Sequence, residues 1–248
     1  NPQLAYSNFD LRHRVVATWS GNWVWNKMNS TSLAFFYSGQ SGSPYSLVYA
    51  SGGNPFGNAA NANLAYIPKD QTDIRLVEYK LNGQTYTATQ QWNDLNSLIE
   101  NDPYLQNHRG QYAERNALRT PWNHELDMKL MHEFKLSKTD KSKSLQISLD
   151  IFNVLNFLNN TWGHITFVTN VNNYTVNLLN FASYNVDASG NPVAVPSGGT
   201  PQHAIGKPSS GYLPTFTFNK PTGLNGHYYT VDPINSRWQG QLGVKLNF

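Results

Sequence analysis

The last residues of the chain alternate between apolar and polar side chains. Counting back from Phe248, every second residue is apolar or glycine as far as Trp238. The residues between them are polar or glycine, and two of them are positively charged. This period of two continues over about twelve residues, which is long enough to cross a bilayer at a tilt. The pattern predicts a membrane-crossing β-strand that ends on an aromatic residue.

Four earlier segments show the same alternation, at residues 11–23, 30–39, 122–136 and 144–155. Each has one largely apolar or aromatic face, and in the last two segments the other face is charged and polar. The fold class predicted is therefore all-β, with about five antiparallel transmembrane strands of a larger β-barrel. The side chains expected to face the lumen are Glu125, Asp127, Lys129, Glu133, Asp150, Arg237 and Lys245.

The connections between these strands alternate in length. Residues 24–29 and 137–143 are short polar turns, whereas residues 40–121 and 157–234 are long segments. Outer-membrane barrels have short periplasmic turns and long extracellular loops, so the chain is expected to end in the periplasm. Five strands do not close such a barrel, and an open sheet edge does not face lipid. We expect further strands on another part of the protein, or else on partner chains.

The long segments have some predicted structure of their own. Residues 87–99 place Trp92, Leu95 and Ile99 at helical spacing, and residues 104–118 are expected to form a second short helix. Residues 187–210 are rich in glycine, proline and serine, which predicts an irregular loop or a hairpin.

Aromatic residues gather near the first short turn. Trp19, Trp23 and Trp25 cluster there, and Phe248 is expected at the same level of the barrel. Tryptophan is enriched where a membrane meets water, so the cluster predicts an interfacial belt on the periplasmic side.

The composition supports this interpretation. Charged residues make up 13% of the chain, about half of the roughly 25% found in an ordinary soluble domain. A disordered chain would be poor in aromatic residues, which here make up 13%, and a helical membrane protein would contain an apolar run of about 18 residues, which is absent. The net charge is +3 without a long basic run, which argues against a nucleic-acid partner. There is no cysteine, which excludes disulfides.

Three stretches carry a resemblance to a known family. They are HRGQYAERNALRTPW at residues 108–122, DIFNVLNFLNNTWG at residues 150–163 and SRWQGQLGVKLNF at residues 236–248. These stretches resemble the C-terminal end of TonB-dependent outer-membrane receptors, and more narrowly the Oar-like branch found in Bacteroidota and myxobacteria. Further segments that fit the same branch are residues 9–20, 36–49 and 63–68, so the resemblance covers nearly the whole chain.

The resemblance implies a 22-stranded barrel in the Gram-negative outer membrane, with a plug and further strands that this chain does not include. Such a receptor imports a ligand, here a peptide, an oligosaccharide or a chelate, with energy from the TonB system. The implied partners are the rest of the barrel and plug, the TonB system, the lipid bilayer and possible surface lipoproteins. Phe248 would be the assembly signal, because the barrel-insertion machinery reads the family's terminal aromatic strand.

Two groups of residues in the long segments are candidates for ligand binding. Arg109, Arg115 and Arg119 could capture an anion or a peptide carboxylate, or could instead form salt bridges between loops or from a loop to the barrel. Trp92 and Trp162 could stack on a sugar or peptide, or could pack the loops together. The sequence leaves both alternatives open.

Catalytic and metal sites have little support. Glu125 and Asp127 share the polar face of one strand, where a ladder of lumen charges is favoured over a catalytic pair. His124 and His132 would lie about 26 Å apart along that strand, too far to share an ion. We expect no enzyme activity, metal or cofactor. Two alternatives to an importer are a structural component of a cell-surface or secretion/assembly complex and a barrel enzyme.

Overall fold

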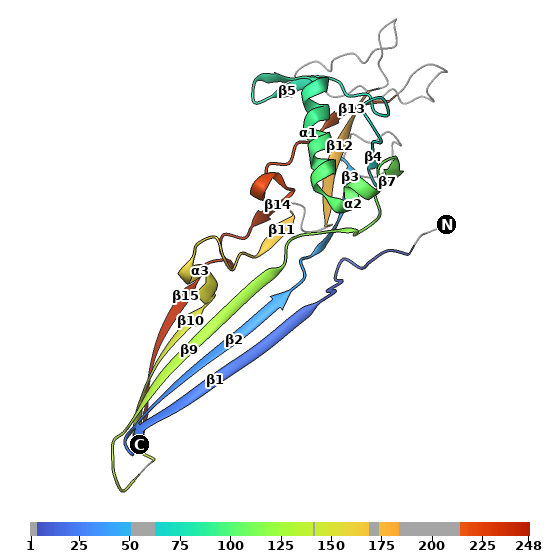
Figure 1. Ribbon diagram of the computed structural model, residues 1–248. Coiled ribbons are helices and arrows are strands. Elements are labelled where there is room, and N and C mark those ends of the chain that lie inside the picture. The colour runs from blue at the N-terminus through green and yellow to red at the C-terminus, as the bar shows by residue number, and fades with distance from the viewer. Residues whose placement is uncertain (1–3, 51–62, 141, 169–173, 184–213) are drawn as a thin grey trace, which may run out of the picture. The chain divides into compact units, whose positions relative to one another are not determined.

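The computed structural model describes residues 4–50, 63–140, 142–168, 174–183 and 214–248 (Figure 1). The chain divides into two compact units, each of which is described by itself. The strand unit comprises Asp10–Ser43, Thr120–Phe167 and Tyr229–Phe248. The loop unit comprises Asn1–Phe9, Pro44–Arg119 and Val168–Tyr228. The irregular segment expected at residues 187–210 lies outside the described residues.

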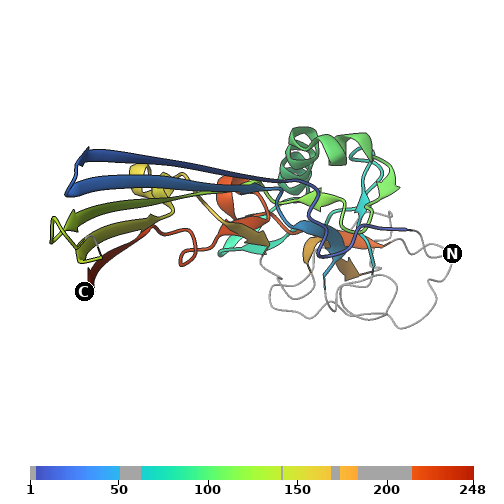
Figure 2. The same cartoon turned by 90° about the horizontal axis from the view of Figure 1, so that it is seen from below.

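The strand unit contains one antiparallel sheet whose five strands follow one another in sequence order. They lie side by side in both views (Figures 1 and 2). The sheet confirms the five predicted strands, with small shifts at their ends. The strands are β1 (Arg14–Asn26), β2 (Asn29–Gln40), β9 (Asn123–Lys135), β10 (Ser144–Phe152) and β15 (Gln239–Asn247).

One strand is shorter than the sequence indicates. Alternation predicts that the fourth strand reaches residue 155, but β10 ends at Phe152 and helix α3 occupies Val154–Leu158. The residue between them, Asn153, has a φ of 54°, which is a left-handed conformation that an extended strand does not contain. Asparagine adopts this conformation more readily than most residues, so Asn153 ends the strand and caps the helix.

The register places most of the large apolar side chains of the five strands on one face. Directly opposite residues in an antiparallel sheet point to the same face. One such row across the sheet contains Leu33, Leu130, Leu149 and Leu242. Leu242 is 72% exposed, and Leu130 and Leu149 are also exposed to the surroundings of the unit. The strand unit therefore presents an apolar face that its own residues do not cover.

Two of the three predicted tryptophans, Trp19 and Trp23, pack against each other in the strand unit. Trp25 and Trp23 lie beside the turn, where Trp23 is opposite Thr31. Trp19 is instead opposite Phe35, in the middle of β1, and packs against it with ring centroids 6.0 Å apart. Strand rise separates the Cα atoms of Trp19 and Trp23 by about 13 Å, but both rings lie over Gly21, and their centroids are 6.3 Å apart.

The loop unit is built from both long connections between the strands. Its main sheet has the strand order β13-β12-β3-β8, in which β12 and β3 are parallel and the other neighbours are antiparallel. Strands β3 and β8 come from the first connection, and β12 and β13 come from the second. The four strands are β3 (Pro44–Tyr49), β8 (Leu118–Arg119), β12 (Thr175–Ser183) and β13 (Thr215–Phe218).

Smaller elements complete the two units. In the loop unit β4 (Tyr66–Ile67) pairs with β7 (Gln111–Tyr112), and a hairpin joins β5 (Tyr79–Leu81) to β6 (Gln84–Tyr86). The hairpin turns at Asn82-Gly83, where both residues have positive φ, as a tight type I′ turn requires. A short ladder joins β11 (Thr166–Val168) to β14 (Tyr229–Val231), and η1 covers Leu224–Gly226.

Helix α1 (Ala88–Asn101) confirms the helix predicted at residues 87–99. Thr87 and Gln90 form a capping box at its start, in which each side chain bonds the backbone of the other residue. Helix α1 and the following α2 are each too short and polar to span a membrane, as is every helix among the described residues.

The second predicted helix is wrong beyond its first turn. Helix α2 covers only Pro103–Asn107, although the sequence predicts a helix over residues 104–118. Gly110 and Asn116 both have positive φ, which breaks a right-handed helix. Part of the remaining segment forms β7 and β8 instead, so pairing with distant strands replaces local helical bonding.

A buried glutamine links the parts of the loop unit. Gln91 of α1 is fully buried. Its Nε2 donates to the carbonyls of Val77 at 2.7 Å and Tyr86 at 3.0 Å, and its Oε1 accepts from the amide of Phe218 at 2.8 Å. Leu95 and Ile99 follow on the same buried helix face. One side chain thus joins α1 to segments from both long connections.

Candidate functional site

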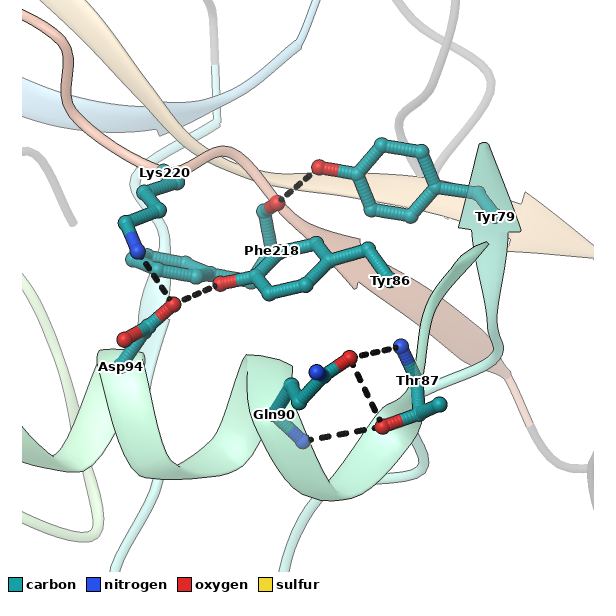
Figure 3. A network of polar contacts seen from close by, with 7 residues as sticks. All are labelled: Tyr79, Tyr86, Thr87, Gln90, Asp94, Phe218 and Lys220. Atoms are coloured by element: carbon teal, nitrogen blue, oxygen red, sulfur yellow. Dashed lines mark hydrogen bonds and ion pairs between the residues drawn. The ribbon is translucent and has the colours of Figure 1, made fainter. Parts of the chain in front are cut away.

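A polar network lies beside α1, and Figure 3 shows its residues. Asp94 Oδ2 accepts a hydrogen bond from the Tyr86 hydroxyl at 2.5 Å and an ion-paired hydrogen bond from Lys220 Nζ at 2.7 Å. Lys220 Nζ also lies 6.0 Å from the centroid of the Tyr86 ring. Behind this network, the Tyr79 hydroxyl donates to the carbonyl of Phe218 at 3.0 Å.

The electrostatics of the network favour the charged ion pair. Burial and the hydrogen bond to Asp94 raise the pKa of Tyr86 well above its usual range, so this hydroxyl stays protonated and donates. Burial alone would raise the pKa of Asp94, but the hydrogen bonds from Lys220 and Tyr86 outweigh it and lower that pKa. At neutral pH the carboxylate is therefore ionised, and its charge is balanced by Lys220.

Two hollows share this ion pair as a common wall. The first hollow has a volume of about 440 Å³ and the second about 420 Å³. Their polar side chains are mainly amides and hydroxyls. The first is lined by Leu81, Gln84, Thr85, Tyr86, Gln90, Asn93, Asp94 and Lys220. The second is lined by Asp94, Ser97, Leu98, Asn101, Phe218, Lys220, Pro221, Asn225, Gly226 and His227.

The three predicted arginines have different surroundings. Arg109 binds within the loop unit: its Nη2 donates to Asn96 Oδ1 at 2.7 Å, and its Nη1 donates to the carbonyl of Lys69 at 3.2 Å. Arg109 also lies 3.8 Å from the carboxylate of Glu100. These contacts attach α1 to the segment before β5, and all of them lie within the first long connection, so they do not join two loops.

Arg115 and Arg119 do not share these surroundings. Arg115 lines a third hollow of about 790 Å³ together with Glu114, Tyr112 and residues near the N-terminus such as Tyr6. Arg119 lies in β8, opposite Pro44 of β3. Anion capture by the three arginines stays a prediction.

The two predicted tryptophans belong to different units. Trp92 lies on α1 and is half-buried, whereas Trp162 belongs to the strand unit and is 52% exposed. Neither lines one of the three hollows described above. Their role in ligand binding also stays a prediction.

The polar face of the five-stranded sheet carries most of the predicted ladder of charges. Lys129 and Asp150 are opposite each other in β9 and β10, and Lys129 Nζ lies 2.8 Å from Asp150 Oδ1. Glu133 accepts from Lys135 Nζ at 3.0 Å and from Gln146 Nε2 at 3.2 Å. Charges on this face thus pair within a strand and across strands.

Other predicted lumen residues extend this face. Lys245 of β15 is opposite Gln146, and Glu125 of β9 is opposite Ser38. Arg237 precedes the start of β15 at Gln239, so strand alternation does not assign it to either face. Phe248 directly follows β15 and is 95% exposed, and its role in assembly stays a prediction.

Asp127 has a structural role that the sequence does not predict. Its Oδ1 accepts from the backbone amide of Asn153 at 2.9 Å. The buried Asn153 side chain donates in turn to the carbonyls of Gly163 at 2.9 Å and Ser236 at 2.8 Å. These bonds join the end of β10 to the segments before β11 and β15. The Asn-Val-Leu-Asn sequence at residues 153–156 marks this point in the sequence, but it does not show which residues Asn153 bonds.

Metal ligation has no support among the described residues, because no group of three or more His, Cys, Asp or Glu side chains in those ranges is arranged to hold an ion.

Comparison with known proteins now gives the family. The family model described as "Outer membrane beta barrel domain" matches residues 3–161 of the chain. The chain belongs to the outer membrane β-barrel family. Comparison with curated proteins and with solved structures finds no match. The protein is therefore located in the outer membrane, and the uncovered apolar face of the strand unit is the face that contacts lipid.

The outer membrane β-barrel carries polar and aromatic contacts towards both ends of its lipid-facing surface. At one end the Tyr37 hydroxyl bonds His124 Nδ1 at 2.7 Å. At the other end Thr31 Oγ1 bonds His132 Nδ1 at 2.8 Å and accepts from Trp25 Nε1 at 2.7 Å. His124 and His132 lie in the same strand, about 26 Å apart along it. Strands of such barrels tilt by about 35–45°, so this separation corresponds to a height of about 20 Å, which lies within the roughly 25 Å apolar band between the two interfacial girdles.

A pair of adjacent positions in β15 tests this assignment of faces. Leu242 lies in the central leucine row, whereas its neighbour Gln241 lies opposite Asp150 on the polar face. We expect Leu242→Arg to destabilise the barrel by about 2–4 kcal/mol, because an arginine then faces the middle of the bilayer. The matched Gln241→Arg should cost much less. Urea unfolding of both variants in lipid vesicles measures the difference, and equal losses would contradict the assignment.

Proposed function

We propose that the chain is the C-terminal barrel portion of a TonB-dependent receptor that imports a ligand across the outer membrane. The observation that carries this proposal is the loop unit: both long connections contribute strands to one folded body with polar hollows. A barrel that only anchors a protein does not need such a body. Ligand sites of small molecules have volumes of about 300–1,000 Å³, a range that includes these hollows.

The location of the loop unit follows from the barrel topology. The short turns and the C-terminus lie at one end of the sheet, and the long connections leave the other end. In outer-membrane barrels the short turns are periplasmic and the long loops are extracellular. On this basis the loop unit faces the medium, where it would meet a ligand first.

Partners complete the proposed receptor. The outer strands β1 and β15 each have one neighbour in the described sheet, and an unpaired edge is costly in lipid. We therefore propose that other strands of the same protein pair with them, and that a plug fills the lumen. The resemblance of the sequence to the Oar-like branch adds the TonB system, the barrel-insertion machinery and a surface lipoprotein as partners. The proposed role is binding and transport rather than catalysis.

The experiment compares growth on a panel of carbon, nitrogen and iron sources. We expect deletion of the receptor gene to abolish growth on at least one source, and loss of TonB to abolish growth on the same source. Re-expression of the full-length protein should restore growth in the receptor deletion alone. A deletion that alters surface assembly or secretion, but not the use of any source, would instead favour a structural component of a surface complex.

A further inference from the structure

We propose that the two hollows beside Asp94 and Lys220 bind an uncharged oligosaccharide of at least two sugar residues. The inference names the ligand class of the receptor. It rests on the proposed function only in requiring that the loop unit face the medium.

A stripe of polar side chains along α1 connects the two hollows. Helical spacing places residues three and four positions apart on the same face. Residues Gln90 and Asn93 line the first hollow, Ser97 and Asn101 line the second, and Asp94 lines both. The stripe is therefore continuous over about three helical turns, which suits an extended ligand more than a compact one.

The charge of the hollows argues against an anionic ligand. In the first hollow the charged side chains are Asp94 and Lys220, whose atoms lie 2.7 Å apart. The second hollow has the same pair and adds the titratable His227. An anion would be repelled by the nearby carboxylate of Asp94, and a cation would be repelled by the ammonium group of Lys220. An uncharged ligand meets neither cost.

The remaining polar groups suit hydroxyls. An asparagine or glutamine amide both donates and accepts, as a sugar hydroxyl does. Gln90 uses its Oε1 to accept from Thr87 in the capping box, which directs its Nε2 to other partners (Figure 3). Asn93 is exposed, and its side chain makes no bond within the part of the chain that the structure describes, so both halves of its amide can meet a ligand. Asp94 can accept from a hydroxyl through its other oxygen, Oδ1, because its bonds to Tyr86 and Lys220 use Oδ2.

Apolar contacts are present but small. Leu81 is 36% exposed beside the first hollow, and Leu98 and Pro221 line the second. Such side chains cover the C–H face of a sugar ring. Many peptide-binding sites hold side chains in apolar pockets. Within the first hollow the aromatic Tyr86 is nearly buried, so a deep apolar pocket is not offered there.

An array of immobilised glycans and peptides tests the ligand class. The probe is the fluorescently labelled full-length protein in detergent, applied to neutral glycans, acidic glycans and a random peptide set. We expect neutral glycans of two or more residues to retain the protein. Asn93→Ala should weaken retention by these glycans about tenfold, because a hydrogen-bonded contact is lost without a change in the fold.

Two further variants make the test specific. Thr89→Ala removes an exposed polar side chain from the same helix outside both hollows, and it should leave retention unchanged. Asp94→Asn leaves Lys220 without its ionised partner, and it should add retention by acidic glycans at low salt. Retention of the wild-type protein by acidic glycans or peptides alone, or by no neutral glycan, would overturn the inference.

The outcome is separable from that of the proposed function. Growth that depends on both the receptor and TonB, without retention by neutral glycans, would reject the oligosaccharide and keep the importer. Retention by neutral glycans that is lost in Asn93→Ala, without any TonB-dependent growth, would keep the binding site and reject import.

Discussion

Replacement of Gln91 by leucine is expected to unfold the loop unit locally. Leucine has a similar size, but it leaves the carbonyls of Val77 and Tyr86 and the amide of Phe218 without the bonds that Gln91 provides. Each buried polar group left unpaired costs about 1–3 kcal/mol, so the free energy of local unfolding should fall by at least about 3 kcal/mol. The loss is large because one side chain serves three separate segments.

Hydrogen exchange of the full-length protein in detergent measures this effect. Peptides that cover α1 and β13 should exchange about a hundredfold faster in Gln91→Leu, as a loss of about 3 kcal/mol implies. The matched variant Asn93→Leu replaces an exposed amide of the same helix by the same residue, and it should leave exchange nearly unchanged. Protection of α1 that is equal in Gln91→Leu and wild type would show that other contacts hold the helix.

Replacement of Asn153 by alanine is expected to destabilise the end of the barrel wall where β10 stops. The variant loses both hydrogen bonds to the carbonyls of Gly163 and Ser236, and the bond in which Oδ1 accepts from the amide of Asn156 at 3.3 Å. It also places alanine at a positive φ, which asparagine tolerates better. Together these losses should cost about 3–5 kcal/mol.

Unfolding of the variant by urea in lipid vesicles gives the measurement. Asn153→Ala should have a lower midpoint than Asn160→Ala, which changes an exposed asparagine in the same segment. Asn153→Gly should recover only part of the loss, because glycine accepts the positive φ but makes no side-chain bond. Gly163→Ala should resemble Asn153→Ala, because its new Cβ would clash with Asn153 Oδ1. Identical midpoints for Asn153→Ala and Asn160→Ala would refute this account.

The five strands were predictable because each one has one face towards lipid and the other towards a polar lumen. A strand between lipid and a polar lumen alternates every second residue, and this pattern is local enough to read along the chain. Helix α1 was predictable for a similar reason, since its buried face repeats at Leu95 and Ile99. Gln91 lies one turn earlier on the same face. A polar residue on a buried helix face indicates that its side chain forms hydrogen bonds inside the fold.

Predictions from local sequence patterns were wrong where pairing with distant segments replaced local hydrogen bonds. Residues 104–118 have helical tendencies, yet β7 pairs with β4 and β8 pairs with β3. The ends of strands are also poorly marked by alternation alone. Strand β10 stops early because Asn153 bonds residues that are 10 and 83 positions away in the chain.

The candidate site depended on tertiary structure to a greater degree. Asp94 and Lys220 are 126 positions apart and come from different long connections, so no spacing rule would have paired them. The arginines that form a basic group in the sequence have separate surroundings, because Arg109 bonds Asn96 and Lys69.

The alternation along single strands is thus enough to predict the strands of the barrel wall, their two faces and the short turns. The reason is that successive side chains of each strand face lipid and the polar lumen in turn. The loop unit, its two hollows and the ion pair of Asp94 and Lys220 depend on contacts between segments that are far apart in the sequence. Those contacts are stabilised by burial of apolar surface and by hydrogen bonds. The sequence of a single segment does not show which distant residues will provide them.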